Sequence, residues 1–169
     1  MDESSEGEAA PAKNHTAVER KSERELVVTR TINAPAHLVF EAWTTAELFR
    51  RWWVPRSFGL TLLSCEMDAR VGGQYRLVFP YEDSTMEFFG TYLEVTPHSR
   101  LVWTNDEGDG GQTITTVTFE ENAGKTLVVV HDLYPSEEAV ASGSTNALPE
   151  ALDQLDELLA SLGPTPAPQ

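Results

Sequence analysis

Cysteine is almost absent from the chain, and this limits both its covalent chemistry and its expected compartment. Cys65 is the only one, so no disulfide can close within the 169 residues and nothing points to an oxidising environment. Cys65 would act as a nucleophile only with a base nearby and a lowered pKa. Its strand neighbours Glu66 and Asp68 alternate to the opposite face, so we expect Cys65 to be a core or cavity-wall residue.

Long apolar runs are also missing. No stretch approaches the roughly 18 apolar residues that a membrane-spanning helix needs. The first residues, "MDESSEGEAAPAKNHT", start with acidic side chains where a secretory signal would carry lysine or arginine. Together with the lone cysteine, these absences predict a cytoplasmic protein with no membrane partner.

Positive charge is scarce. The chain has 12 Lys and Arg residues against 27 Asp and Glu residues, which gives a formal net charge of −15. Nucleic acids and anionic membranes are bound by clustered cations, so neither is expected as a partner. The acidic surface fits solubility, a high-salt cell or a basic partner, and composition does not separate these three.

Sequence patterns for metals and nucleotides are absent as well. No His and Cys residues have the spacing of a zinc site, and there is no calcium-binding loop of the EF-hand type. The glycine pair in "RVGGQY" opens a strand, whereas a phosphate-binding loop opens a helix. The sequence therefore predicts no metal and no tightly bound cofactor.

The composition is that of one folded domain between two tails. Residues 1–23 are acidic and lack hydrophobic periodicity, which predicts a disordered N-terminal tail. The final "GPTPAPQ" ends the preceding helix and predicts a flexible C-terminal tail over 163–169. Residues 24–162 are expected to form the domain, and a chain with 40% apolar residues can bury a core.

Hydrophobic periodicity predicts an α+β domain with seven strands. The β-branched segment "ELVVTRTIN" over 25–33 reads as the first strand, and two short helices should follow in "APAHLVFEAWT" and "TAELFRRWW", the second ended by Pro55. Six consecutive strands come next, in "TLLSCEMDA", "VGGQYRLVFP", "MEFFGTYLEV", "RLVWTN", "QTITTVTFEE" and "KTLVVVHDL". The first two of these should pair as a hairpin. In the third, Glu87 and Glu94 fall on opposite faces, which a bulge near Gly90 would resolve.

The last segment, "LPEALDQLDELLASLG", has the strongest pattern. Leucines lie along one side of a helix and acidic residues along the other. A run of short antiparallel strands is the only surface large enough to cover such a stripe, so the helix should pack on the sheet. The leucines are Leu148, Leu152, Leu155, Leu158, Leu159 and Leu162, and the acidic residues are Glu150, Asp153, Asp156 and Glu157.

Four segments in this order resemble one protein family. They are "RTINAPAHLVFEAWTTAELFRRWW", "DARVGGQYR", "GTYLEVTPHSRLVWT" and "ALDQLDELLA". The order of elements is similar to the helix-grip architecture of the START-like, or SRPBCC, superfamily. The segments resemble its branch of homologues of the activator of heat-shock-protein-90 ATPase, and the resemblance runs from about Arg24 to Leu162.

The resemblance implies a curved antiparallel sheet wrapped around the C-terminal helix, with an apolar cavity between them. In many relatives such a cavity holds a lipid, a polyketide or another hydrophobic molecule. The superfamily also includes cyclases, hormone receptors and chaperone activators, so the fold leaves function open. The eukaryotic co-chaperone has an additional N-terminal domain that carries much of its chaperone contact. Residues 1–23 are too few and too polar to supply that domain, which weakens the case for a chaperone partner.

Aromatic residues on neighbouring strands are the candidate ligand-binding set. Each of them could equally fill the core, but a cavity wall must be built from such side chains. In the stretch "FRRWWVPRSF" we expect Trp52 to pack inward and Trp53 and Phe58 to border the cavity mouth. The predicted ligand-binding residues are Trp53, Phe58, Tyr75, Phe79, Phe88, Tyr92, Trp103 and His131.

His131 is the candidate for catalysis. It ends an apolar strand in the same alternating set as Leu127 and Val129. If that set faces the cavity, His131 could hydrogen-bond a ligand or carry a proton. If it does not, His131 is a hydrogen-bonded histidine at a strand end.

Three functions remain open from the sequence. The leading one is a protein that binds a small hydrophobic or aromatic molecule without catalysis, with Tyr75, Tyr92 or His131 fixing its orientation. The second is an enzyme of the cyclase or hydrolase type with His131 as proton carrier. The third is a protein-interaction module related to the chaperone activators. The identity of the ligand stays open, and so does a homodimer, since relatives in this branch often pair.

Overall fold

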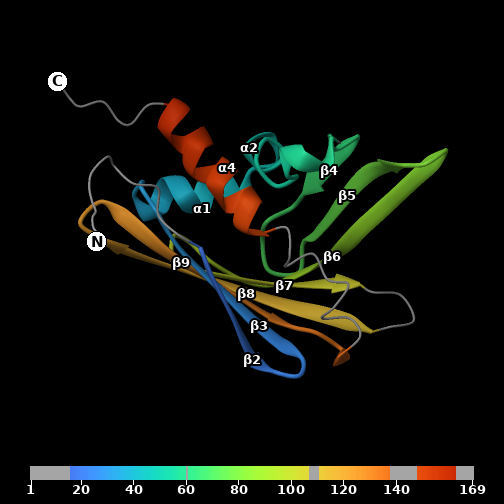
Figure 1. Ribbon diagram of the computed structural model, residues 1–169, viewed down its shortest axis with the longest axis horizontal. Coiled ribbons are helices and arrows are strands. Elements are labelled where there is room, and N and C mark those ends of the chain that lie inside the picture. The colour runs from blue at the N-terminus through green and yellow to red at the C-terminus, as the bar shows by residue number, and fades with distance from the viewer. Residues whose placement is uncertain (1–15, 60, 107–110, 138–147, 163–169) are drawn as a thin grey trace, which may run out of the picture.

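Over the described residues the chain folds into an eight-stranded antiparallel sheet with its helices on one face (Figure 1). The computed structural model describes residues 16–59, 61–106, 111–137 and 148–162, so the predictions for 1–15 and 163–169 lie outside it. The strand order is β2-β3-β9-β8-β7-β6-β5-β4. The strands are β2 Ala17–Ser22, β3 Glu25–Ile32, β4 Ser64–Met67, β5 Gln74–Tyr81, β6 Ser84–Thr96, β7 Arg100–Asp106, β8 Gln112–Asn122 and β9 Lys125–Leu133.

The sheet is curved and wraps around the C-terminal helix, as predicted. In Figure 1, strands β2, β3, β9, β8 and β7 form a floor beneath the helices, while β4, β5 and β6 rise beside them. The predicted hairpin of β4 and β5 is confirmed by its register, in which Cys65 lies opposite Leu77. The α+β helix-grip arrangement predicted from the sequence is therefore confirmed.

The described part of the chain has eight strands in the sheet, where the sequence predicts seven. The additional strand is β2, which pairs antiparallel with β3 and places Ala17 opposite Thr29. All six side chains of β2 are exposed, so the strand has no apolar alternation and is held by backbone hydrogen bonds. The prediction of a disordered tail through residue 23 is wrong for residues 17–22.

Two short helices follow β3, as predicted. The first begins after Pro35, whose fixed φ suits a helix start, and Glu121 of β8 accepts a hydrogen bond from the Ala36 N–H at 2.9 Å. The second is a single turn, shorter than the sequence pattern predicts. The helices are α1 Ala36–Thr44, α2 Ala46–Phe49, the 3₁₀ turn η1 Arg56–Phe58 and α4 Leu148–Ser161.

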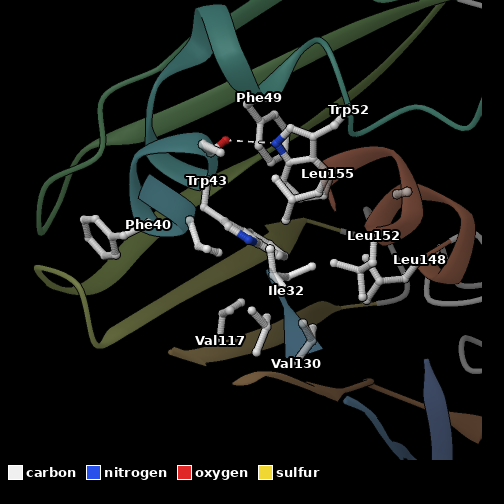
Figure 2. Packing of buried hydrophobic residues seen from close by; sticks show 14 of the residues in the cluster. Ile32, Phe40, Trp43, Phe49, Trp52, Val117, Val130, Leu148, Leu152 and Leu155 are labelled. Carbon is white, nitrogen blue, oxygen red and sulfur yellow. Dashed lines mark hydrogen bonds between the residues drawn. The ribbon is translucent and has the colours of Figure 1, made fainter. Parts of the chain in front are cut away.

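The core forms where α1 and α4 meet the sheet. Figure 2 shows Trp43 at its centre, between the α4 leucines and sheet residues such as Ile32 and Val117. Trp43 is 1% exposed and Trp52 is 0% exposed. Buried rings of this size supply much of the apolar area that stabilises a domain. The leucine stripe of α4 faces this core as predicted, except for Leu162, which is exposed.

Strand β6 changes neighbours along its length. Its first part pairs with β5 and its last part with β7, and the register slips between Tyr92 and Glu94, so that Leu93 bulges outward. The predicted bulge exists, but it lies three residues beyond Gly90. Gly90 has a different role, because a Cβ there would lie 1.8 Å from the carbonyl oxygen of Thr104. Only glycine allows two backbones to approach this closely.

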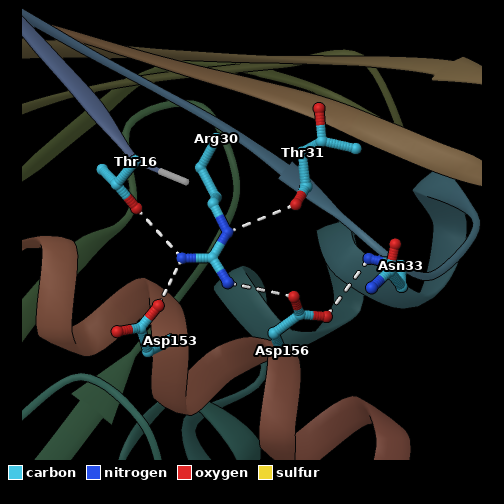
Figure 3. A network of polar contacts seen from close by, with 6 residues as sticks. All are labelled: Thr16, Arg30, Thr31, Asn33, Asp153 and Asp156. Carbon is cyan, nitrogen blue, oxygen red and sulfur yellow. Dashed lines mark hydrogen bonds and ion pairs between the residues drawn. The ribbon is translucent and has the colours of Figure 1, made fainter. Parts of the chain in front are cut away.

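A buried arginine ties α4 to the sheet. Arg30 of β3 is 1% exposed, and its guanidinium donates to Asp153 at 2.5 Å and to Asp156 at 3.0 Å (Figure 3). It also donates to the Thr16 hydroxyl at 3.0 Å, while Asp156 accepts a further bond from the Asn33 N–H at 3.2 Å. Part of the acidic side of α4 therefore contacts protein and positions the helix.

We expect Arg30→Met to lower the free energy of unfolding by about 2–3 kcal/mol, because it leaves two partly buried carboxylates without their cation. Asp153 and Asp156 retain 39% and 16% side-chain exposure, which keeps the loss below that for a fully buried pair. Urea denaturation measures the change. The control is Arg100→Met, which removes a solvent-exposed pair with Glu94 and should cost less than about 1 kcal/mol. Equal losses in the two variants would contradict this account.

Candidate functional site

A cavity of about 300 Å³ lies among the sheet, α4 and the segment that follows α2. Its walls come from parts of the chain that are far apart in sequence: Trp43 of α1, Phe49 of α2, residues 53–58, strands β4 to β9, Tyr134 and the first turn of α4. Most lining side chains are aromatic or aliphatic, and the volume lies at the lower end of the range for pockets that hold small molecules. The curvature of the sheet thus leaves room beneath α4 that the core residues do not fill.

Seven of the eight residues predicted to bind a ligand line this cavity. Phe58 is 55% exposed and Met86 is 38% exposed while both also line the cavity, so they mark its opening to solvent. Ligand contact itself stays a prediction for all seven. They are Trp53, Phe58, Tyr75, Phe79, Phe88, Tyr92 and Trp103.

His131 lies on the other face of the sheet. Along β9 the buried positions are Thr126, Val128, Val130 and Asp132, so His131 points away from the cavity. Its Nε2 lies 2.8 Å from a carboxylate oxygen of Glu25, and this hydrogen bond lowers the pKa of Glu25 below its ordinary value. The alternative in which the His131 set faces the cavity is wrong, and His131 is a hydrogen-bonded histidine on an outer strand face.

Asp132, the residue after His131, faces the cavity in its place. It is 7% exposed and accepts a hydrogen bond from the Thr115 hydroxyl at 2.5 Å. Thr113 and Asn105 line the same region, so the sheet presents a polar patch at one end of a largely apolar cavity. A buried carboxylate is costly unless it is hydrogen-bonded, which makes this patch the chemically distinctive part of the site. Asp132 is not among the site residues predicted from the sequence.

Two of the tyrosines that line the cavity, Tyr75 and Tyr92, have different environments. The Tyr75 hydroxyl donates to the backbone carbonyl of Thr104 at 2.8 Å and lies 3.1 Å from Asn105 Oδ1, so it supports the wall. Tyr92 is 3% exposed, and burial raises the pKa of its phenol above the ordinary value. The hydroxyl of Tyr92 is therefore protonated in the folded protein at neutral pH.

The two adjacent tryptophans serve different parts of the structure, as predicted. Trp52 is fully buried and donates its indole N–H to the Ala42 carbonyl at 3.0 Å. Trp53 is half-buried and lines the cavity, with its ring stacked on Phe49 at a centroid distance of 4.7 Å. One ring thus belongs to the core and its neighbour to the cavity wall.

Gln154 of α4 holds the cavity-lining segment in place. Its side-chain amide donates to the carbonyls of Trp52 and Val54, each at 2.9 Å, and its oxygen accepts from the Arg56 N–H at 2.7 Å. Glu150 adds bonds to the N–H and hydroxyl of Ser57 at 3.1 and 2.6 Å. The polar residues of α4 therefore fix the segment that forms the cavity mouth. The only feature of the sequence that hints at these contacts is a glutamine, Gln154, among the apolar residues of the helix.

Cys65 is half-buried, with its sulfur 3.8 Å from the Ala46 carbonyl, and burial raises the pKa of its thiol. A thiol with a raised pKa is a poor nucleophile, in keeping with a structural residue. Among the residues that the structure describes, no three His, Cys, Asp or Glu side chains gather as a metal site. In the same part of the chain, no helix combines the length and the apolar character needed to span a membrane.

Solved structures share the helix-grip architecture of this chain. A protein of Rhodobacter sphaeroides is 24% identical, with a TM-score of 0.78, and the match covers 87% of this chain and 99% of that one. A protein of Chromobacterium violaceum is 26% identical, with a TM-score of 0.69 and coverage of 79% and 96%. A protein of Mycobacterium smegmatis is 19% identical, with a TM-score of 0.74 and coverage of 90% and 99%.

The family model described as "Activator of Hsp90 ATPase homolog 1-like protein" matches residues 33–160. The chain belongs to this family. No curated protein matches the sequence. The family and the fold support a ligand-binding module or an activator-type module, and the START-like resemblance read from the sequence is confirmed.

We expect Gln154→Leu to lower the free energy of unfolding by about 2–4 kcal/mol, because three backbone groups near the cavity mouth lose their partner. Amide hydrogen exchange should rise in residues 52–58 more than in β8 or β9. The matched control on the same helix is Glu157→Gln, since Glu157 makes only an exposed ion pair with Arg56. If exchange in residues 52–58 is the same in both variants, Gln154 does not hold this segment.

Proposed function

We propose that this protein binds a small hydrophobic or aromatic molecule in the cavity beneath α4. The observation that carries the proposal is the cavity of about 300 Å³, walled by aromatic and aliphatic side chains and closed at one end by a few polar groups. Burying apolar surface contributes about 25 cal/mol per Å², so a guest that fills such a space gains affinity mainly from its apolar body. The polar groups would then fix its orientation.

Catalysis with His131 as proton carrier is not supported by the geometry. His131 and the cavity lie on opposite faces of β9, and a general acid or base must be within hydrogen-bond reach of the reacting group. The binding role needs no such group. It is therefore the function that the described residues favour.

An interaction with a chaperone is the second candidate, and the family description is the observation that favours it. The net charge of −15 would suit a basic surface on such a partner. A pull-down of an Hsp90-type chaperone by the purified protein tests it, at low salt and again at about 0.5 M salt, where charge attraction is screened. Salt-sensitive capture favours this candidate, and absence of capture at both salt concentrations removes it.

Filling the cavity should abolish ligand binding. Ala151 of α4 is 2% exposed and lines the cavity, so Ala151→Phe places a ring in the space that a guest would occupy. We expect the affinity for N-phenyl-1-naphthylamine, a neutral apolar dye, to fall at least about tenfold in a fluorescence titration. Met86→Trp, at the half-open mouth, provides a second obstruction that does not disturb the core.

The matched control is Ala160→Phe, which makes the same substitution at an exposed position of the same helix. It should bind the dye as the unmodified protein does. Circular dichroism and thermal unfolding establish that each variant is folded. Undiminished dye affinity in folded Ala151→Phe and Met86→Trp would show that the dye binds elsewhere and would overturn the proposal.

His131→Ala should leave the dye affinity within about twofold of the unmodified protein, because the imidazole lies outside the cavity. The same titration measures it. A loss of tenfold or more would mean that the outer face of β9 takes part in binding, against the geometry described above.

A further inference from the structure

Tyr92 brings to the cavity wall a hydroxyl that the described part of the chain does not use. The residue lines the cavity and is 3% exposed. Its hydroxyl has no hydrogen-bond partner among the residues that the structure describes. Buried polar groups in native proteins are nearly always hydrogen-bonded, so an unpaired one calls for a partner from outside the chain.

Open space adjoins this hydroxyl. Among the described residues, the indole N–H of Trp43 is the one buried side-chain group that is both unpaired and fully sealed by its neighbours. The Tyr92 hydroxyl is also unpaired but is not sealed in this way, so it retains accessible surface. Because Tyr92 as a whole is buried and lines the cavity, that surface faces the cavity.

The other polar side chains of the cavity wall already have partners. The Tyr75 hydroxyl donates to the Thr104 carbonyl, and the Thr115 hydroxyl donates to Asp132. The remaining ones also interact within the protein, and they are Asn105, Thr113 and Tyr134. Within the described part of the wall, Tyr92 is therefore the polar side chain that is both unpaired and open to a guest.

The position of Tyr92 is fixed on several sides. Its backbone N–H donates to the Gly73 carbonyl and its carbonyl accepts from the Gly72 N–H, each at 2.9 Å. Its ring packs edge-to-face with those of Tyr75 and Trp103, at centroid distances of 5.9 and 6.4 Å. The bulge of β6 follows directly, and bulges often re-aim side chains beside functional sites. A donor held in this way is preorganised, so a guest that pairs with it loses little free energy to ordering.

The chemistry of the hydroxyl decides what it can bind. Burial, followed by the nearby Cys65 and Asp68, raises the pKa of the phenol, so the group keeps its proton and can donate. None of the described residues that line the cavity is Lys, Arg or His, so an anionic guest would find no cation there. The partner that fits is a neutral oxygen that accepts a hydrogen bond.

We propose that the cavity selects neutral aromatic guests that carry an acceptor oxygen, such as a ketone, and that this oxygen accepts a hydrogen bond from the Tyr92 hydroxyl. This inference rests on the proposed function and names the class of its ligand. The flat apolar body of such a guest packs against the aromatic wall. A guest without an acceptor leaves the hydroxyl unpaired and shielded from water, which is the costly case for a buried donor.

Three compounds with one body and nearly one shape test the choice of substituent: 2-acetylnaphthalene, 2-isopropenylnaphthalene and 2-naphthoate. The first two differ only in a carbonyl oxygen that is replaced by a methylene group. Titrations of ¹⁵N-labelled protein followed by amide chemical shifts give the affinities and locate the site. We expect the ketone to bind at least about fivefold more tightly than the alkene, in line with one neutral hydrogen bond, and the carboxylate to bind more weakly than the ketone.

Tyr92→Phe removes the hydroxyl and keeps the ring. We expect the ketone to lose its advantage, so that the ratio of ketone to alkene affinities falls at least about fivefold. The alkene should bind the variant at least as tightly as it binds the unmodified protein, because no hydroxyl is left unpaired. The matched control is Thr118→Val, which also removes one hydroxyl, from the face of β8 that points away from the cavity. It should preserve the preference for the ketone.

Thermal unfolding of Tyr92→Phe gives a second, independent readout. The variant should unfold at the same temperature as the unmodified protein or higher, since the hydroxyl has no partner in the described part of the chain to lose. A lower midpoint, or failure to fold, would show that the hydroxyl is paired inside the protein and would overturn the proposal.

The binding outcomes separate the two levels of the proposal. A ratio of ketone to alkene affinities that Tyr92→Phe leaves unchanged, or tighter binding of the alkene or the carboxylate to the unmodified protein, would overturn the selection for acceptor oxygens. In that case, binding of N-phenyl-1-naphthylamine that Ala151→Phe abolishes would leave the proposed function standing. If neither the dye nor any of the three compounds binds, both the selection and the proposed function fail.

Discussion

Polar contacts along α4 determine where the helix lies, and the cavity depends on that position. Apolar burial is non-directional, so the leucine stripe alone would accept many placements on the sheet. Hydrogen bonds have narrow limits of length and angle. Arg30 joins Asp153 and Asp156 to β3 on one flank, and Gln154 joins the backbone of residues 52–56 on the other. The helix is thus held over the sheet at a height that leaves the space beneath it.

Sequence patterns were informative where one face of an element is buried and the other is wet. The α4 stripe, the alternation in β8 and the turn residues between strands all follow this rule, and the fold follows from them. Strand β2 breaks the rule because all its side chains are exposed, so nothing in its composition distinguishes it from a tail. β2 forms because its backbone pairs with β3, and backbone pairing leaves no pattern in the side chains.

Single residues of the cavity wall likewise fall into those that the sequence pattern predicts and those that it does not. Aromatic side chains on inward positions could be predicted, but β9 has apolar residues at both parities, from Leu127 to Val130. A one-residue difference in phase moves every side chain to the other face, and this decides between His131 and Asp132. Gln154 could be noticed as a polar residue within an apolar stripe. Its partners could not be predicted, because they are backbone groups of a segment about 100 positions earlier in the chain.

The four tryptophans of this protein belong to a single aromatic assembly. Trp43 contacts the other three, with centroid distances of 4.8 Å to Trp52, 6.0 Å to Trp53 and 5.8 Å to Trp103. Three of the four line the cavity, and the buried indole N–H of Trp43 has no hydrogen-bond partner among the residues that the structure describes. The intrinsic ultraviolet emission of the chain therefore originates at one place. The wavelength and intensity of this tryptophan fluorescence therefore report on the cavity without an attached label.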